Sequence, residues 1–393
     1  MKDDTHFRLR SLSALALATT VALGTATPAA AEDIQIGFAA GLTGYLAFFD
    51  GAVLEGAEMA VAEINAAGGI EGLGTIELIA RDMRSETAAA AVVARELVAE
   101  GVSALLVPCD VDPAIAVGQI AARAEIPMIA ACASTPILAG EIGPYMFQLK
   151  TADTLQAAVL ADYAIAQGYE TAHILLSPDT PYTDLLPQWF AEAFEARGGS
   201  LLGTTTYAFD QQNFTAEATA IAALDPAPDV VMTSAYEPHF PAFITALRAA
   251  GSDVPVLGSD GIDSPTTFGI GDPAEGVVFS MAGFPAPGSD LEAFYRAHEA
   301  QYGDYEPFAF SATGYEAIQL FAAAMAAAGS TEGPAVRDAL DAIVDFDGVT
   351  GTTITFAGQD RIALRDVTLV EVAGGEAVSL GQFAPDPATV PSP

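Results

Sequence analysis

EDIQIGFAAGLTG (residues 32–44) and the segment that runs from it to AVAEINAAGGI (residues 60–70) decide the fold. A short apolar run at 34–39 breaks at Gly41, and a loop of small residues follows. Apolar residues then recur at helical spacing, at Val53, Ala57, Val61 and Ile64. The order strand, loop, helix is the opening unit of a parallel α/β domain. Open parallel sheets hold small ligands at the carboxyl ends of their strands, so the loop after this strand is a candidate binding loop.

An export signal precedes this unit. Residues 1–31 begin with basic side chains, continue with an apolar stretch at 12–26 and finish with Ala29-Ala30-Ala31, which predicts a Sec-type signal peptide cleaved before Glu32. The apolar stretch is too short and too rich in Ala and Thr for a stable membrane span. The alternative is an uncleaved N-terminal anchor. We expect the mature protein to be soluble and periplasmic.

The chain is strongly acidic, with 14 Lys and Arg against 51 Asp and Glu. Removal of residues 1–31 takes away three basic and two acidic groups, which leaves 11 against 49 and a net charge of 11 − 49 = −38. Such a surface repels phosphate backbones and anionic lipids, which argues against nucleic acid or a membrane surface as a partner. Because 51% of the residues are apolar, the chain can still bury a core.

The two cysteines, Cys109 and Cys132, each follow a short apolar run, at 104–108 and 127–131. If these runs form neighbouring strands, the sulfurs lie within disulfide reach in an oxidising compartment. The alternative is a pair of small buried thiols beside the loops.

Strand and helix signals alternate along the chain in two series, divided near Lys150. The first predicts strands at 34–39, 75–81, 104–108, 127–131 and 145–149 and helices at 51–67, 87–100 and 113–124. The second predicts strands at 172–176, 200–207, 230–234, 255–257 and 276–280 and helices at 154–167, 184–197, 214–224 and 240–250. Alternating units of this kind imply parallel sheets covered on both faces. The predicted fold class is therefore α/β, with two doubly wound parallel-sheet lobes.

Three late helices are predicted at 290–302, 309–328 and 334–343. The first lobe has fewer helices than its sheet needs, so we expect the chain to return to that lobe after about residue 280. The helix at 309–328 is nearly all apolar but contains Glu316 and Gln319, which favours a buried core helix over a membrane span. A terminal β pair is predicted at 351–356 and 362–372, and a disordered Pro-rich tail from Ala384.

Enzyme motifs are mostly missing from the sequence. No Gly-x-Gly-x-x-Gly follows a strand, and neither a Gly-Lys-Ser/Thr loop nor a Gly-x-Ser-x-Gly elbow is present. The histidines His173, His239 and His298 lack metal-ligand spacing. A hydrolase that uses a pair of carboxylates is not excluded in a chain with so many acidic residues, although no pair stands out in the sequence. We expect no catalysis, no metal and no cofactor.

Polar and aromatic residues gather just after the predicted strands. They lie at 41–49, 109–113 and 132–136 in the first series and at 177–182, 234–236 and 258–261 in the second. Carboxyl ends of parallel strands share one edge of a sheet, so each lobe is expected to present these loops together, and two facing edges make a cleft.

Several short motifs are informative through their order and spacing: IGFAAGLTG at 36–44, EINAAGGI at 63–70, IPMIA at 126–130, LRAAG at 247–251 and GSDG at 258–261. With them the chain resembles the periplasmic branched-chain amino acid binding proteins of the Leu/Ile/Val type, the soluble receptors of ABC importers. The resemblance covers nearly all of the mature chain. It implies a type I, Venus-flytrap architecture with three crossover segments near 149–151, 279–281 and 357–362. Lobe 1 would then comprise 32–149 and 281–357, lobe 2 would comprise 150–280 and 358–383, and 384–393 would be the tail.

The resemblance also implies roles for individual residues. Ser134 matches a hydroxyl that holds the ligand carboxylate together with backbone N–H groups, beside a backbone contact at Cys132. Asp260 matches the acid that takes the ligand ammonium, Tyr236 a second polar partner and Tyr182 an aromatic contact from lobe 2. The apolar contacts of the first loop correspond to Tyr45, Phe48 and Phe49.

Each assignment has a structural alternative. Ser134 and Thr135 can cap the following helix, and Asp260 with Gly261 can form an ordinary turn. Tyr45, Phe48 and Phe49 can be core residues.

One departure from the family pattern concerns the ligand. Asp110-Val111-Asp112 stands where the family has a Ser/Thr cluster. Two carboxylates about 4 Å apart repel by about 4 kcal/mol at an effective dielectric constant of 20. Asp112 is interpreted as the cap of a helix that starts at Pro113, and the role of Asp110 is left open. Amides, urea and cationic compounds therefore remain candidate ligands beside amino acids.

The sequence thus predicts a monomeric solute-binding protein that captures a small polar molecule, an amino acid above all, by hinge closure and docks on ABC permease subunits of the inner membrane. The main alternative is a sensory receptor of the same fold for an amide, urea or small carboxylate.

Overall fold

The computed structural model describes residues 33–303, 309–386 and 388–393. The predicted signal peptide, residues 1–31, lies outside the described residues. Within the described ranges, every helix is too short or too polar to cross a membrane.

The first sheet has five strands, all parallel, in the order β2-β1-β3-β4-β5. The strands are β1 (Ile34–Ala40), β2 (Ile76–Asp82), β3 (Ala104–Leu106), β4 (Met128–Ala130) and β5 (Met146–Gln148). The helices that connect them are α1 (Ala47–Ala66), α2 (Thr87–Glu100), α3 (Val111–Arg123) and α4 (Ile137–Ile142). Almost every residue of β1, β3, β4 and β5 is buried, as expected for a parallel sheet covered on both faces, whereas most residues of the edge strand β2 are partly exposed.

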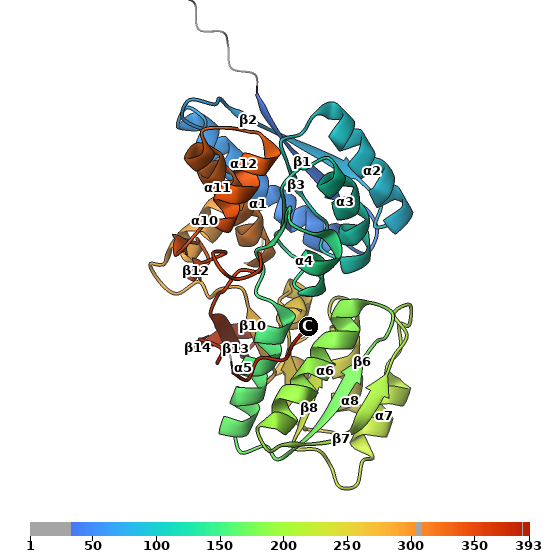
Figure 1. Ribbon diagram of the computed structural model, residues 1–393. Helices are drawn as coiled ribbons and strands as arrows, with labels where there is room; N and C mark the ends of the chain where they lie inside the picture. The colour runs from blue at the N-terminus through green and yellow to red at the C-terminus, as the bar shows by residue number, and fades with distance from the viewer. Residues whose placement is uncertain (1–32, 304–308, 387) are drawn as a thin grey trace, which may run out of the picture. The chain divides into compact units, whose positions relative to one another are not determined.

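Three late helices, α10 (Asp290–Tyr302), α11 (Ala309–Ala328) and α12 (Gly333–Asp341), follow the parallel strands of the second sheet in the chain but lie beside the first sheet (Figure 1). α11 packs along α1 at close range. A Cβ at Gly56 of α1 would lie 1.7 Å from the carbonyl oxygen of Ser311, and one at Gly314 would lie 2.1 Å from that of Val53. Glycines at these contacts let the helix backbones approach, so the predicted return of the chain to the first lobe is observed.

The second sheet has seven strands in the order β14-β13-β10-β9-β8-β6-β7. β6 to β10 are parallel, whereas β13 runs antiparallel to β10 and to β14. The strands are β6 (Thr171–Leu176), β7 (Ser200–Thr206), β8 (Val230–Thr233), β9 (Val256–Gly258), β10 (Val278–Met281), β13 (Val367–Ala373) and β14 (Glu376–Phe383). Its helices are α5 (Asp153–Ala166), α6 (Pro181–Ala196), α7 (Thr215–Ala222), α8 (His239–Ala249) and α9 (Pro265–Gly269), with 3₁₀ turns η1 (Asp260–Ile262) and η2 (Asp272–Ala274).

Helices cover both faces of the second sheet. Ile174 and Met232 pack in one core with residues of α5 and α6, whereas their neighbours Leu175 and Val231 pack in another with residues of α7 and α8. Side chains alternate across a strand, so these two cores lie on opposite faces. The predicted α/β class with doubly wound parallel sheets is confirmed.

The parallel parts of the two sheets share one strand order. β2-β1-β3-β4-β5 corresponds to β7-β6-β8-β9-β10, with the second strand of each series placed outside the first. In such sheets the order in which successive strands are added reverses at the parallel pairs β1/β3 and β6/β8, and ligands bind at the carboxyl ends of the strands beside that point. The lobe boundaries implied by the resemblance stay a prediction.

The predicted terminal β pair is wrong. β13 pairs with β14 through a two-residue turn at Gly374-Gly375, whose φ angles of +64° and +81° suit glycine and a tight hairpin. Residues 353–354 (β12) pair instead with 346–347 (β11), and a single bridge between Thr355 and Leu364 is what remains of the predicted pairing. In the tail that was predicted to be disordered, Thr389 accepts hydrogen bonds from Arg197.

Candidate functional site

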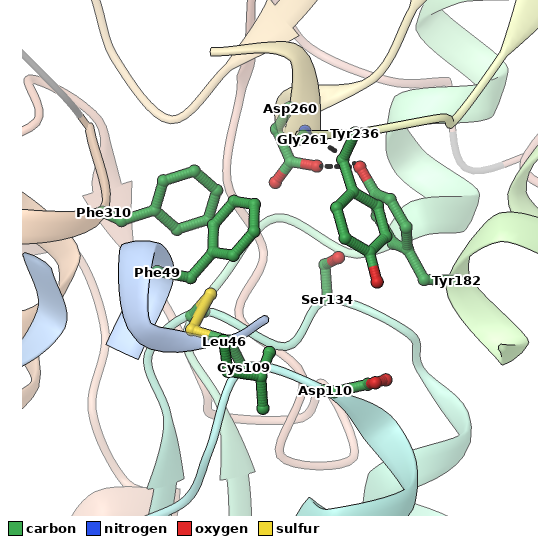
Figure 2. A pocket seen from close by; sticks show the side chains of 11 residues that line it. Leu46, Phe49, Cys109, Asp110, Ser134, Tyr182, Tyr236, Asp260, Gly261 and Phe310 are labelled. Carbon is green, nitrogen blue, oxygen red and sulfur yellow. Dashed lines mark hydrogen bonds between the residues drawn. A yellow bond between two sulfur atoms is a disulfide. The ribbon is translucent and has the colours of Figure 1, made fainter. Parts of the chain in front are cut away.

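A small pocket lies between loops that follow strands of both sheets (Figure 2). Its lining comprises Leu46, Phe49, Cys109, Asp110, Cys132, Ser134, Tyr182, Tyr236, Asp260, Gly261 and Phe310. Apart from Phe310, at the start of α11, these residues come from the loops and helix starts after β1, β3, β4, β6, β8 and β9. The shared edge of each parallel sheet therefore brings together segments that are far apart in the sequence.

A disulfide between Cys109 and Cys132 joins the loops after β3 and β4, with the two Cα atoms 4.8 Å apart. These strands are direct neighbours in the first sheet, which places the two cysteines side by side. The disulfide fixes the adjoining Asp110 and Ser134 in the same part of the pocket wall.

Asp260 forms a buried ion pair that the sequence reasoning missed. Its Oδ2 lies 3.2 Å from Nζ of Lys150, and the two side chains are 5% and 1% exposed. Its Oδ1 accepts a 2.8 Å hydrogen bond from the Tyr182 hydroxyl, which also accepts from the backbone N–H of Gly261. Lys150 Nζ lies 3.8 Å from the ring centroid of Phe310. The sequence signal was weak: Lys150 is the one lysine after residue 31.

Further carboxyl groups lie behind the pocket wall. Burial and the charge of Asp260 raise the pKa of Asp153 to about 8, and the hydrogen bond from the Thr135 hydroxyl opposes that shift. The Thr135 bond measures 2.7 Å. Burial likewise raises the pKa of Asp263, whose Oδ2 accepts from the Ala309 N–H, to about 7. Asp153 and Asp263, close to the Lys150–Asp260 pair, therefore hold their protons to a higher pH than ordinary carboxyl groups do.

Asp50 does not line the pocket but holds together two of the loops that do. Its carboxyl accepts hydrogen bonds from the backbone N–H groups of Gly41, at 2.6 Å, and Cys109, at 2.8 Å. It thereby ties the loop after β1 to the loop after β3. Burial raises the pKa of this fully buried side chain to about 7.

Asp110, not Asp112, caps α3. The helix begins at Val111, two residues earlier than predicted, and Asp110 Oδ1 accepts the Val111 N–H at 2.7 Å. Its Oδ2 accepts a 2.5 Å hydrogen bond from the Tyr45 hydroxyl. Asp112 is exposed in the first turn, so its predicted capping role is wrong.

Aromatic rings form two walls of the pocket (Figure 2). Phe49 and Phe310 pack edge to face on one side, with centroids 5.3 Å apart, and Tyr182 and Tyr236 pack on the other, 5.8 Å apart. Phe49 also meets Tyr236 at 5.6 Å, which joins a side chain of α1 to the loop after β8. Tyr45 makes a similar edge contact with Phe209, beyond β7.

The structure brings most of the predicted site residues to one pocket, where Ser134 and Asp260 both line the wall. Tyr45, Phe48 and Thr135 are not part of the lining: Tyr45 bonds Asp110, Phe48 packs on Phe49 and Thr135 bonds Asp153. Their ligand-binding roles stay untested predictions. Sequence reasoning missed Leu46, Cys109, Gly261 and Phe310 as lining residues. A Cβ at Gly261 would lie 2.7 Å from Cβ of Tyr236, a close approach that only the structure reveals.

Among the described residues, no cluster of three His, Cys, Asp or Glu side chains is arranged to hold a metal ion. The pocket can supply hydrogen-bond acceptors, a neutral phenol donor and apolar ring surface.

A family model for periplasmic binding proteins matches residues 33–377. The chain is 28% identical over 316 residues to the Leu/Ile/Val-binding protein BraC3 of Rhizobium johnstonii, covering 80% of this chain and 85% of that protein. It is 29% identical to an amino acid binding protein of Pseudomonas aeruginosa, covering 81% and 84%.

Solved structures agree with this likeness. The branched-chain amino acid transporter substrate-binding protein LivJ from Streptococcus pneumoniae, in complex with isoleucine, superposes with a TM-score of 0.81 at 26% identity and covers 90% of this chain and 99% of that one. A solute-binding protein from R. palustris in complex with benzoate has a TM-score of 0.80 at 22% identity, covering 90% and 97%, and shows a common fold.

Proposed function

The chain belongs to the periplasmic binding protein family, and from that premise we propose that it is the extracytoplasmic solute-binding component of an ABC importer for a small polar solute, with amino acids as the leading class. In this proposal the protein binds the solute, returns it chemically unchanged and docks on permease subunits.

One observation carries the proposal: a single pocket takes its lining from the carboxyl-end loops of both sheets. A ligand held there touches segments of both sheets at once. Binding then favours the arrangement in which the two sets of loops are close, because the separated arrangement lacks half of the contacts.

The pocket chemistry supports a small amphipathic solute. Leu46, Phe49 and Phe310 offer apolar surface for the body of the ligand, and Asp260 offers a carboxylate for an ammonium group. The Leu/Ile/Val-binding relatives support an amino acid as the first class to test. The pairing of ligand groups with these side chains rests on the position of each side chain in the pocket.

A thermal-shift screen of the purified mature chain tests the proposal. The library contains amino acids, their amides, small amines and small carboxylates, and each hit is followed by calorimetry. We expect at least one compound to raise the melting temperature and to bind with one-to-one stoichiometry. Mass spectrometry of the mixture after incubation should recover the compound unchanged, and turnover would contradict a binding-only role.

A further inference from the structure

The acceptors on the pocket wall outnumber its donors. Asp110 and Asp260 are the charged side chains that line it, and the lining includes no Arg, Lys or His. Lys150 stands behind Asp260 and is engaged with that carboxylate. Asp50, Asp153 and Asp263 surround the site with further carboxyl groups, all fully or almost fully buried. A free carboxylate entering this pocket meets no cation of its own.

Ser134 adds a hydroxyl to the same lining. A hydroxyl carries one proton and two lone pairs, so it can accept a hydrogen bond from an N–H group of a ligand. The residue that the family resemblance assigns to a ligand carboxylate can therefore also take a donor here.

Asp110 reinforces that polarity on the same part of the wall. The Cys109–Cys132 disulfide holds the Asp110 loop against the Ser134 loop, so an anion at Ser134 lies in the field of Asp110. The N-terminus of α3 and the hydrogen bonds from Val111 and Tyr45 stabilise the ionised form of Asp110. Burial opposes them and raises its pKa.

The pocket also contains a neutral hydrogen-bond donor, the Tyr236 hydroxyl. The hydroxyl of Tyr236 lies on the side of the pocket where Ser134 and Asp110 are drawn (Figure 2). Burial raises the pKa of this phenol well above its usual value, which keeps it protonated. A phenol suits the carbonyl oxygen of an amide, while the surrounding acceptors suit N–H groups.

Resting on the proposed function, and narrowing its solute class from amino acids to amines and amides, we propose that this pocket selects solutes that carry N–H donors as an amine or amide over solutes with a free carboxylate at the Asp110–Ser134 wall. The apolar part of such a ligand packs against Phe49 and Phe310, which line the pocket side by side. The strongly acidic surface of the chain, net −37 overall, favours the approach of cations over anions.

A matched ligand series tests this inference. Leucine, leucinamide, 3-methylbutylamine, 4-methylpentanamide and 4-methylpentanoate vary the polar groups on closely similar branched apolar bodies. Calorimetry on the mature chain at pH 8 should rank leucinamide at least tenfold above leucine and show no binding of 4-methylpentanoate. The same ranking applies to every acid and amide pair in the general screen, so the test does not depend on the leucine skeleton.

Two variants locate the effect. Asp110→Asn keeps the shape and removes the charge, and should improve the affinity for leucine at least tenfold while changing that for leucinamide less than threefold. Asp112→Asn is the matched control, because Asp112 is exposed, lies in the same helical turn and does not line the pocket. It should leave both affinities within twofold. The wild-type ligand ranking stands as a test even if Asp110→Asn fails to fold.

The outcomes separate this inference from the proposed function. Tighter binding of free acids than of their amides overturns the inference and leaves solute binding intact. Equal weakening of all ligands by Asp110→Asn also overturns it, because that result assigns Asp110 a structural role. The absence of a thermal shift with any library member overturns the proposed function and the inference with it.

Discussion

Nζ of Lys150 lies 3.2 Å from Oδ2 of Asp260, and both side chains are almost completely buried. Lys150 follows β5 of the first sheet by two residues, whereas Asp260 follows β9 of the second sheet. The pair therefore links the segment that leaves the first sheet to the pocket wall supplied by the second. It also determines how much of the Asp260 charge remains for a ligand.

Loss of one partner should destabilise the fold. Asp260→Ala leaves the Lys150 ammonium buried and unpaired, and breaking a buried pair in this way typically costs about 3–5 kcal/mol. Urea denaturation should show a fall of that size in the free energy of unfolding. The double variant Asp260→Ala/Lys150→Met should recover part of it. A single variant as stable as the wild type would show that the pair contributes little.

Binding of an ammonium-bearing ligand should depend on the charge of Asp260. Asp260→Asn keeps the side-chain shape, and hydrogen bonds to charged groups are worth about 1.5–3 kcal/mol, so affinity should fall at least tenfold. Calorimetry with the best amine or amino acid from the screen measures this. Asp253→Asn, an exposed acid of the same sheet region, is the control. Unchanged affinity would remove Asp260 from the binding site.

The Cys109–Cys132 disulfide should stabilise both fold and pocket. The cysteines are 23 residues apart, and closing a loop of that length contributes about 3 kcal/mol through the entropy of the unfolded chain. The Cys109→Ser/Cys132→Ser variant should lose about that much stability in urea and also lose ligand affinity, because both residues line the pocket. Thiol titration of the denatured wild type should find no free thiols. Two titratable thiols would contradict the bridge.

Stability should fall as the pH rises from 6.5 to 8.5. Folding raises the pKa of Asp153 to about 8 and those of Asp50 and Asp263 to about 7. Below these values the folded chain holds protons that the unfolded chain has released, so the stabilisation is lost as each group ionises in the folded state. We expect a decrease of the order of 1 kcal/mol per pH unit in urea denaturation.

Between pH 6.5 and 8.5 the titration of histidines contributes little to the change in stability. Burial lowers the pKa of His298 to about 4, which makes stability rise with pH at lower values, and above pH 6.5 histidine is mostly neutral in both states. Asp153→Asn should flatten the dependence between pH 7 and 8.5. A flat wild-type profile would show that these carboxyls ionise normally.

Added NaCl should stabilise the protein. The net charge of −37 makes the folded surface repel itself, and salt screens such repulsion within about 10 Å at 0.1 M. The melting temperature should rise between 20 mM and 1 M NaCl, with KCl giving the same rise. Flat or falling values would mean that specific ion pairs outweigh the repulsion.

The sequence alone determined the class of fold and the place of the site. Hydrophobic periodicity and glycine stops located the strands and helices of both sheets, and the polar residues after strands marked the loops that meet at the pocket. These features are local, because a strand, a helix or a turn is largely specified by neighbouring residues. The error at the terminal β pair also concerns a local signal: the Gly374-Gly375 turn closes the observed β13–β14 hairpin, and the prediction did not use it.

Only the tertiary structure decided the electrostatics of the site. Nothing near Lys150 in the sequence indicates that it meets Asp260, 110 residues later, or that Asp153 and Asp263 lie around the same pair. The cap of α3 at Asp110 likewise depends on Tyr45, which reaches it from another loop. Charge pairing, burial and the resulting pKa values depend on distances through space, and the sheet edges set those distances by joining segments that the sequence keeps apart.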